Sequence, residues 1–312
     1  MSGYDRNLVM VQTENLQSRA EFEAIAARVA ARAPEIEVFV VNNSMRNSVS
    51  TRAAALRPTL VFSPIELRRF KPRRGKIYAG RSHSKIEEMQ QMQRHGVPVP
   101  DGVILEPQTR LDPGTWGPFT VLKPNRGLGG NGIRLARTRD VRWTDPESWP
   151  RDDPRYGRPI VAQKFVDTGA YTTCHKVTVL FGRPLWSTTS RALATRPFRV
   201  DPDGTEPLNE PIAANHGERT VTLNFDDAVL AVGVHAAQAF PDIPVAGVDV
   251  IREESTGRLF ALEVNAGGLT WHTSSGLGLA LQRDRGIDLV AQFGALDVAA
   301  DALIEVTRRE AA

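Results

Sequence analysis

The chain has 312 residues, with 39 Lys and Arg against 36 Asp and Glu, which gives a net charge of +3. This near balance argues against a nucleic-acid-binding protein, and the single cysteine excludes an internal disulfide and is typical of a reducing, cytoplasmic location. No stretch reaches the roughly 20 apolar residues that a membrane-spanning helix needs, and residues 1–6 lack the features of a signal peptide. The length suits two compact units.

The first 74 residues alternate strand and helix patterns. Three short apolar runs are typical of buried strands: 8–11, 36–41 and 59–62. Between the first two, apolar residues recur at helical spacing from Phe22 to Ala33, and Pro34 ends the pattern. This β-α-β-α-β order predicts a small parallel sheet with helices on its faces. No Gly-x-Gly-x-x-Gly follows the first strand, so the sheet carries no dinucleotide fingerprint.

A second unit follows a basic segment at 65–80, which we predict to be a solvated connection, with a patch for an acidic substrate as the alternative. Ser84 and Glu87 form a capping box for a helix that stops at Gly96. The segments 138–159 and 196–218 predict loops. Later strands are predicted at 103–105, 119–122, 160–166, 176–181, 245–251 and 259–265, and later helices at 226–240 and 286–309.

A glycine-rich segment follows the strand at 119–122. It begins at Lys123 and contains four glycines within six residues: Gly127, Gly129, Gly130 and Gly132. Glycine lets backbone N–H groups approach phosphate oxygens closely, and a lysine at the strand end supplies a positive charge. The segment lacks the Gly-Lys-Ser/Thr of a Walker loop. It predicts a phosphate-binding loop, with an ordinary Gly-rich hairpin turn as the alternative.

Two acids and an amide converge in the hairpin predicted from the last two strands. If Ser255-Thr256-Gly257 closes the hairpin, Asp249 faces Glu263, and Asn265 projects from the same face as Glu263. Opposed carboxylates in an apolar hairpin repel each other unless a cation lies between them. Oxygen ligands suit Mg²⁺ or Mn²⁺ rather than zinc. The hairpin therefore predicts a divalent metal site, with one acid turned to solvent by a bulge as the alternative.

Three lysine and arginine positions complete the set of candidates. Lys176 and Arg191 flank a turn at 182–184, so we expect them on adjacent antiparallel strands, with exposed strand cations as the alternative. Lys85 stands in the first turn of a helix, where a cation opposes the macrodipole and a bound anion would remove that cost. A tolerated exposed lysine is the alternative. Cys174, two residues before Lys176, is expected to be a bystander.

The order of these pieces resembles the ATP-grasp superfamily of carboxylate–amine ligases, and within it the branch that adds amino acids to peptide or protein tails. The resemblance covers about residues 75–280 and includes the turn Gly96-Val97-Pro98-Val99-Pro100. It implies an α/β (α+β) fold with a small parallel-sheet domain at 1–74. A two-part ATP-grasp domain would follow at 75–312, with antiparallel sheets that clamp the nucleotide. Its central, lid-bearing part would span 75–165 and its metal-binding part 166–312.

The resemblance also implies a role for each matching residue. Lys85 and Lys123 would contact the phosphates of ATP, under a lid made by Gly127, Gly129, Gly130 and Gly132. The hinge that binds adenine would be Gln163, Lys164, Phe165 and Val166, with Asp167 near the ribose. Arg191 would meet the γ-phosphate or the acyl phosphate, and Lys176 the substrate carboxylate. The Mg²⁺ or Mn²⁺ ligands would be Asp249, Glu263 and Asn265.

The implied reaction is ATP-dependent ligation. A carboxylate is activated as an acyl phosphate and joined to an amine of a small molecule or peptide, with release of ADP and phosphate. Residues 266–272 depart from the Ser-Pro-Gly that relatives often carry there, so the resemblance does not identify the residues of the substrate pocket. His216 and His272 are candidates for a general base. The alternatives are a small-molecule kinase on the same fold and a non-catalytic nucleotide-binding module. As oligomer we expect a homodimer, the commonest soluble form.

Overall fold

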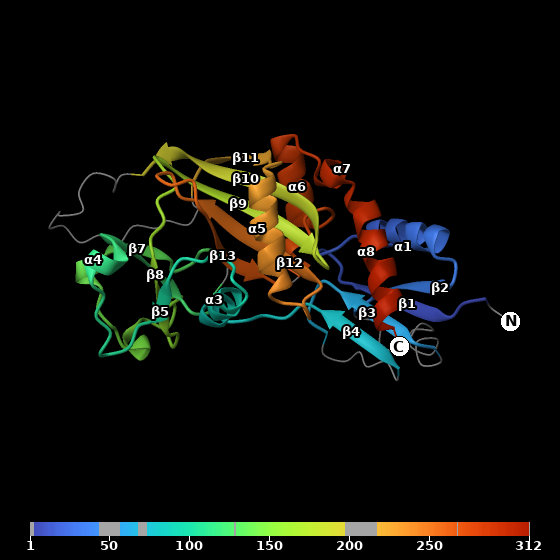
Figure 1. The fold of residues 1–312 in the computed structure, drawn as a ribbon, viewed down its shortest axis with the longest axis horizontal. Coiled ribbons are helices and arrows are strands. Elements are labelled where there is room, and N and C mark those ends of the chain that lie inside the picture. The colour runs from blue at the N-terminus through green and yellow to red at the C-terminus, as the bar shows by residue number, and fades with distance from the viewer. Residues whose placement is uncertain are drawn as a thin grey trace.

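The computed structural model describes residues 3–43, 57–67, 74–127, 129–196, 217–266 and 268–311. Three sheets follow one another along the long axis of the molecule, with a parallel sheet at one end and a small antiparallel sheet at the other (Figure 1). This arrangement confirms the predicted architecture of a parallel sheet followed by two antiparallel sheets. None of the helices within these ranges is both long and apolar enough to cross a membrane.

The first sheet is parallel, with the strand order β2-β1-β3-β4. Its strands are β1 (Arg6–Gln12), β2 (Ile36–Asn42), β3 (Thr59–Ser63) and β4 (Gly75–Ala79). Helix α1 (Arg19–Arg32) begins after Ser18, whose hydroxyl accepts a hydrogen bond from the backbone N–H of Glu21. The residues at helical spacing that bury one face of α1 are Phe22, Ile25 and Val29. Helix α8 (Ala295–Glu310) returns from the other end of the chain and packs beside α1.

Strand β4 corrects the prediction that residues 65–80 form a solvated connection. It lies at the edge of the sheet and buries only Tyr78, so its apolar pattern is too weak to be recognised. The Lys76 ammonium lies 3.2 Å from the carboxylate of Glu310 and above the ring of Tyr78. The rest of the basic cluster, at 68–73, lies outside the described residues. The parallel sheet therefore continues past the predicted boundary at residue 74, and the division into domains stays a prediction.

The second sheet is antiparallel, with the order β5-β8-β6-β7. Its strands are β5 (Gly102–Ile104), β6 (Phe119–Pro124), β7 (Arg134–Arg137) and β8 (Ile160–Lys164). Helix α3 (Lys85–Arg94) precedes it and carries the predicted capping box at Ser84 and Glu87. Strand β7 and helix α4 (Pro113–Trp116) were not predicted, because four residues are too few to show a period. The connection from 138 to 159 is irregular, as predicted, apart from two short 3-10 turns.

The third sheet is also antiparallel, with the order β11-β10-β9-β12-β13. Its strands are β9 (Tyr171–Leu180), β10 (Arg183–Thr195), β11 (Arg219–Leu223), β12 (Val245–Arg252) and β13 (Leu259–Asn265). Helix α5 (Asp227–Gln238) packs its buried side on one face of this sheet, against Val177 and Val248. Strand β11 was not predicted, and residues 197–216 of the predicted loop lie outside the described residues. The face opposite α5 carries the charged candidates.

The C-terminal region corrects the prediction of a single helix at 286–309. Three helices follow one another: α6 (Gly276–Arg285), α7 (Leu289–Phe293) and α8. Gly286 and Gly294 adopt left-handed φ angles of 62° and 68° and end α6 and α7. These two glycines are C-caps. The sequence prediction missed them as helix ends because apolar residues recur at helical spacing on both sides of Gly294.

Buried rings join the parallel sheet to the third sheet. The Trp271 indole packs 5.4 Å from the ring of Phe22, and its Nε1 donates a hydrogen bond of 2.6 Å to Glu21. In the turn between β9 and β10, Phe181 has a φ of 47°, and its ring packs 5.1 Å from that of Tyr78. A bulky residue at positive φ is strained. The ring contact with Tyr78 therefore helps to stabilise a backbone conformation that phenylalanine disfavours. The two sheets therefore share one hydrophobic core.

The close approach of α5 to β9 gives a stability prediction. A Cβ added at Gly233 would lie 2.6 Å from the Cβ of Val177, so Gly233→Ala must displace the helix. Ala gains about 1 kcal/mol over Gly in a helix interior, whereas overpacking costs about 1–3 kcal/mol. We expect the free energy of unfolding, measured by urea denaturation, to fall. Gly276→Ala, which meets no atom within 4 Å, is the matched control; equal effects of the two variants would contradict the packing argument.

Candidate functional site

The predicted facing of the two acids is confirmed. Asp249 of β12 lies directly opposite Glu263 of β13, and Asn265 follows on the same face. On the other side of β12, Asp249 lies opposite Lys176 of β9. We call Asp249, Glu263 and Asn265 the acid set. It lies on the face of the third sheet opposite α5, because its members alternate with Val248, Val250 and Val264 of the α5 core.

The register of this hairpin rests on two compensating features. The chain reverses through four residues, 254–257, because the Glu253 N–H bonds to the carbonyl of Arg258. A bulge then falls between the pairs Val250–Ala261 and Asp249–Glu263. The bulge adds a residue to β13 and restores the register that a three-residue turn would have produced. It therefore brings Glu263 to the same face as Asp249 and does not turn an acid to solvent.

Each carboxylate of the acid set forms an ion pair with a lysine. The Lys85 Nζ lies 2.6 Å from Glu263 Oε2, and the Lys176 Nζ lies 2.6 Å from Asp249 Oδ1. Burial would lower the pKa of each lysine, but the attraction of its carboxylate outweighs burial and raises that pKa. Burial likewise opposes ionisation of Glu263, but Lys85 holds its pKa at about 2. The four side chains are 14–30% exposed, so a ligand can reach them.

The amide of Asn265 is bonded to both carboxylates. Its Nδ2 donates to Glu263 Oε1 at 3.1 Å and lies 3.5 Å from Asp249 Oδ2. Burial raises the pKa of Asp249 and the nearby Glu263 adds to the rise, against the pull of Lys176. The three side chains thus converge as predicted, and the Asn265 amide donates to an oxygen of each carboxylate.

Helix α3 and strand β6 bring Lys85 and Lys123 to the acid set. The backbone N–H of Lys85 donates to the carbonyl of Asn125, and the N–H of Ile86 donates to the Asn125 side chain. The first residues after β6 therefore cap the N-terminus of α3. Lys123 is 6% exposed, and burial lowers its pKa to about 8, although the charge of Glu263 partly opposes this shift. Three lysines from three elements thus surround two carboxylates.

Glu88 is a buried acid that the sequence analysis did not single out. It lies one turn after Lys85 on α3, and its Oε2 accepts a long hydrogen bond of 3.4 Å from the backbone N–H of Val264. Burial raises the pKa of Glu88 to about 8, and the charge of Glu263 adds to the rise. The spacing of three residues from Lys85 could have identified Glu88 in the sequence, because it places both side chains on the face of α3 that meets β13.

The glycine-rich segment has the backbone freedom that its sequence predicted. Gly129, Gly130 and Gly132 have φ angles of 68°, 74° and 76°, and Gly127 has a φ of 157°. A Cβ at Gly132 would lie 2.8 Å from the ring of Pro124. The segment directly follows β6 and its buried Lys123, so the lysine and the glycines belong to one local structure.

The predicted hinge connects β8 to the third sheet. Its anchors are the Gln163 amide, which lies 3.4 Å from the carbonyl of Pro100, and the Lys164 ammonium, which lies 2.8 Å from Asp101. The Arg196 guanidinium lies over the Phe165 ring and 3.3 Å from the Asp167 carboxylate. Val166 packs in an apolar cluster with Cys174, Ile251, Phe260 and Leu262. Burial raises the pKa of Cys174, so the thiol is a poor nucleophile there.

Arg191 is not brought to the acid set. It lies on β10, the strand adjacent to that of Lys176, as predicted. However, Thr188 is the residue opposite Lys176, and Arg191 is three positions further along, so the two side chains point to opposite faces. The Arg191 guanidinium instead stacks 4.3 Å from the ring centre of Tyr171. The predicted contact of Arg191 with the γ-phosphate has no support in this geometry.

His272 lies near Lys176 and stacks on Trp186 of β10, with ring centres 5.4 Å apart. Burial lowers the pKa of His272 to about 4, and the charge of Lys176 adds to the effect, so the ring is neutral. The neighbouring Trp271 side chain is buried against the parallel sheet. His216, the other candidate base, lies outside the described residues.

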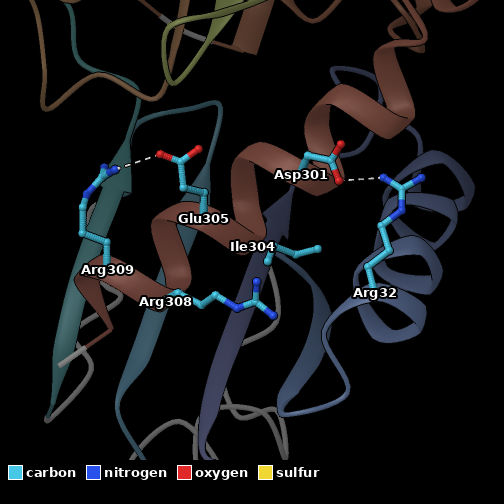
Figure 2. Close-up of a pocket in the computed structure, with 6 residues that line it drawn as sticks. All are labelled: Arg32, Asp301, Ile304, Glu305, Arg308 and Arg309. Carbon is cyan, nitrogen blue, oxygen red and sulfur yellow. Dashed lines mark hydrogen bonds and ion pairs between the residues drawn. The ribbon is translucent and has the colours of Figure 1, made fainter.

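A hollow of about 510 Å³ lies elsewhere, between α1 and α8 (Figure 2). Its lining residues are Arg32, Asp301, Ile304, Glu305, Arg308 and Arg309. Its charged groups pair with one another or with neighbours: Arg32 with Asp301 at 2.8 Å, for example. The hollow is thus matched in charge, and the acid set remains the candidate site.

Comparison with known proteins identifies the fold. No protein-family model and no curated sequence matches the chain. Among solved structures, the chain matches the ATP-grasp ligase PsnB with a TM-score of 0.52 at 14% sequence identity. That structure is a complex with a phosphomimetic variant of minimal precursor, Mg and ADP. The match covers 97% of this chain and 99% of PsnB. The D-cycloserine synthetase DcsG matches with a TM-score of 0.51 at 15% identity, over 96% of this chain and 99% of DcsG.

The chain has the ATP-grasp fold. The acid set offers two carboxylates and an amide oxygen, which is a donor set that Mg²⁺ accepts together with water and phosphate oxygens. Among the described residues, no group of three or more His, Cys, Asp and Glu gathers as a metal site, and the acid set contains two carboxylates. The residues fit the ion expected in an ATP-grasp protein, and their individual roles stay predictions.

The buried Glu88 gives a pH prediction. Its pKa is raised from 4.5 to about 8, so between these values the folded protein binds this proton more tightly than the unfolded chain does. Stability must therefore fall as pH rises through that window, and Glu88→Gln should remove the loss. Between pH 5 and 8, we expect the unfolding free energy of the wild type to fall by about 1–3 kcal/mol relative to Glu88→Gln in urea titrations. If the unfolding free energies of the wild type and of Glu88→Gln changed equally with pH, this expectation would be contradicted.

Proposed function

We propose that the protein is an ATP-dependent ligase that activates a carboxylate as an acyl phosphate and joins it to an amine. The observation that supports this most is the acid set, which faces three lysines from three different elements in a chain with the ATP-grasp fold. Such a site can neutralise a polyphosphate and its metal ions together. The PsnB complex holds Mg and ADP, which supports Mg²⁺ and ATP as the cofactors here.

In this proposal the nucleotide lies between the second and third sheets. Its adenine contacts the backbone of the hinge at Gln163, Lys164, Phe165 and Val166, against the apolar cluster of Val166, Cys174 and Ile251. Asp167 lies near the ribose. Lys85, Lys123 and the glycine segment contact the phosphates: glycine amides and lysine ammonium groups are phosphate donors, and the glycine segment directly follows Lys123 at the end of β6. Arg191 is omitted from this site because it points to the opposite face of the sheet.

The chemistry would rest on positioning and on charge. A substrate carboxylate oxygen attacks the γ-phosphorus, the bond to the β-phosphate oxygen breaks, and ADP leaves. The amine then attacks the acyl carbon and displaces phosphate. Mg²⁺ held by the acid set would neutralise the phosphate charges. Lys123 and Lys85 hold the phosphoryl oxygens in line, and Lys176 orients a substrate carboxylate. His272 is neutral near Lys176, but a pKa of about 4 makes its ring a weak base, so we assign no residue as the proton acceptor.

For the substrates we propose a peptide together with an amino acid or another small molecule. The support is the PsnB structure, which holds a precursor, and the predicted resemblance to ligases that act on peptide or protein tails. Small-molecule carboxylates and amines form a separate arm of the test, because DcsG, a D-cycloserine synthetase, has the same fold.

The test follows ADP and product masses after incubation of the pure protein with Mg-ATP and pools of peptides, amino acids, carboxylates and amines. We expect ADP formation that depends on both a carboxylate and an amine. Asp249→Asn should lower the rate by about 100-fold or more, because it removes a charge on which the metal and the phosphates depend. Asp301→Asn, the same substitution on α8 within the charge-matched hollow, is the matched control and should leave the rate unchanged.

Two outcomes would point to the alternatives. A stable phosphoester with no need for an amine would indicate a small-molecule kinase on the same fold. Binding of Mg-ATP with no ADP from any pool would indicate a non-catalytic nucleotide-binding module.

A further inference from the structure

The three predicted metal ligands already have N–H donors in the places where a metal would bind. Glu263 holds the Lys85 ammonium, Asp249 holds the Lys176 ammonium, and Asn265 directs its amide nitrogen between the two acids. A divalent ion held by all three side chains would take an oxygen from each of them, and the rest of its coordination from water or phosphate. To bind one, the two ammonium groups must move away and the Asn265 amide must rotate by half a turn. The folded chain therefore opposes metal binding through its own cations.

The lysines can leave only if another anion receives them. A lysine removed from a carboxylate in a partly buried site keeps a charge that has lost its partner, which is costly. Lys85 stands at the N-terminus of α3, next to the glycine segment, and Lys123 lies buried on the same side. The phosphate oxygens of a nucleotide would offer the Lys85 ammonium a new partner and so free Glu263. A phosphate or the substrate carboxylate would do the same for Lys176 and free Asp249 for the metal.

We propose that this protein binds its divalent metal and its nucleotide by exchange of ion partners, with Lys85 and Lys176 excluding the metal until an anion takes them over. The inference rests on the proposed function, since it assumes that the acid set is a metal site. It concerns coupling between two ligands. Coupling free energies of this kind change affinities by about 5–150-fold and act equally in both directions. The metal should therefore strengthen nucleotide binding by the same factor.

The experiment uses the full-length protein, with Mn²⁺ as the metal, followed by its EPR signal, and ADP as the nucleotide, followed by calorimetry. For the wild type we expect Mn²⁺ to bind at least about 5-fold more weakly without ADP than with saturating ADP. Lys176→Met removes one excluding cation and keeps the length of the side chain. It should bind Mn²⁺ at least about 5-fold more tightly than the wild type when ADP is absent.

Two further variants keep the result interpretable. Lys176→Gln retains an N–H donor for Asp249 without the charge, and it serves if Lys176→Met does not fold. Lys76→Met is the matched control, because Lys76 is also paired with a carboxylate, at 3.2 Å, but on β4 outside the site. It should bind Mn²⁺ as the wild type does.

The outcomes separate the exchange from the proposed function. Equal Mn²⁺ affinity with and without ADP in the wild type would overturn the exchange and leave the metal site intact. So would Lys176→Met and Lys176→Gln variants that bind Mn²⁺ no more tightly than the wild type. Failure of the wild type to bind Mn²⁺ even with ADP would overturn the metal site, and with it the proposed function. The exchange is supported when the wild type binds Mn²⁺ more weakly without ADP than with it, and when the Lys176 variants, but not Lys76→Met, bind Mn²⁺ more tightly than the wild type without ADP.

Discussion

Two carboxylates that face each other across one hairpin set the main constraint on this structure. Asp249 and Glu263 lie opposite each other in a sheet whose other face is packed with Val and Ala under α5. Like charges at that spacing repel, and partial burial strengthens the repulsion, so the fold must bring cations to them. It brings Lys85 from α3 and Lys176 from β9. A site that gathers this much opposing charge is well suited to polyphosphate chemistry.

The constraint ties distant parts of the chain together. Asn125, just after β6, accepts hydrogen bonds from the backbone N–H groups of Lys85 and Ile86 and so holds the first turn of α3 against the second sheet, where Lys85 reaches Glu263. Glu88, one turn later, contacts the backbone between Glu263 and Asn265. The second sheet therefore meets the third through α3, and the phosphate-binding candidates Lys85 and Lys123 take their positions from that contact. The parallel sheet acts from further away, through Trp271 and Glu21, on the segment that carries His272.

The sequence missed elements of this fold for two physical reasons. Strands β4 and β7 are short or half-exposed, so they bury too few residues to show a period of two. The break between α7 and α8 depends on Gly294 adopting a left-handed conformation, which a period of apolar residues does not reveal. The elements α1, α5, β12 and β13 were predicted close to their observed bounds from their apolar residues, and α3 was predicted from its capping box and the glycine that ends it.

The sequence by itself predicted the class of the fold through the resemblance of its ordered motifs to ATP-grasp ligases. It also predicted which candidate ligands lie together, because residue type and spacing along one strand or hairpin decide which side chains share a face. The pairing of Asp249 with Glu263 followed from that rule. Only the tertiary structure decided that Lys176 joins the acid set and Arg191 does not. Thr188 of β10 pairs with Lys176, and Arg191 lies three positions after Thr188, so its side chain points to the opposite face of the sheet. The tertiary structure alone placed Glu88 beside Glu263 and put lysines where the metal ligands point, because these contacts join segments more than 70 residues apart along the chain.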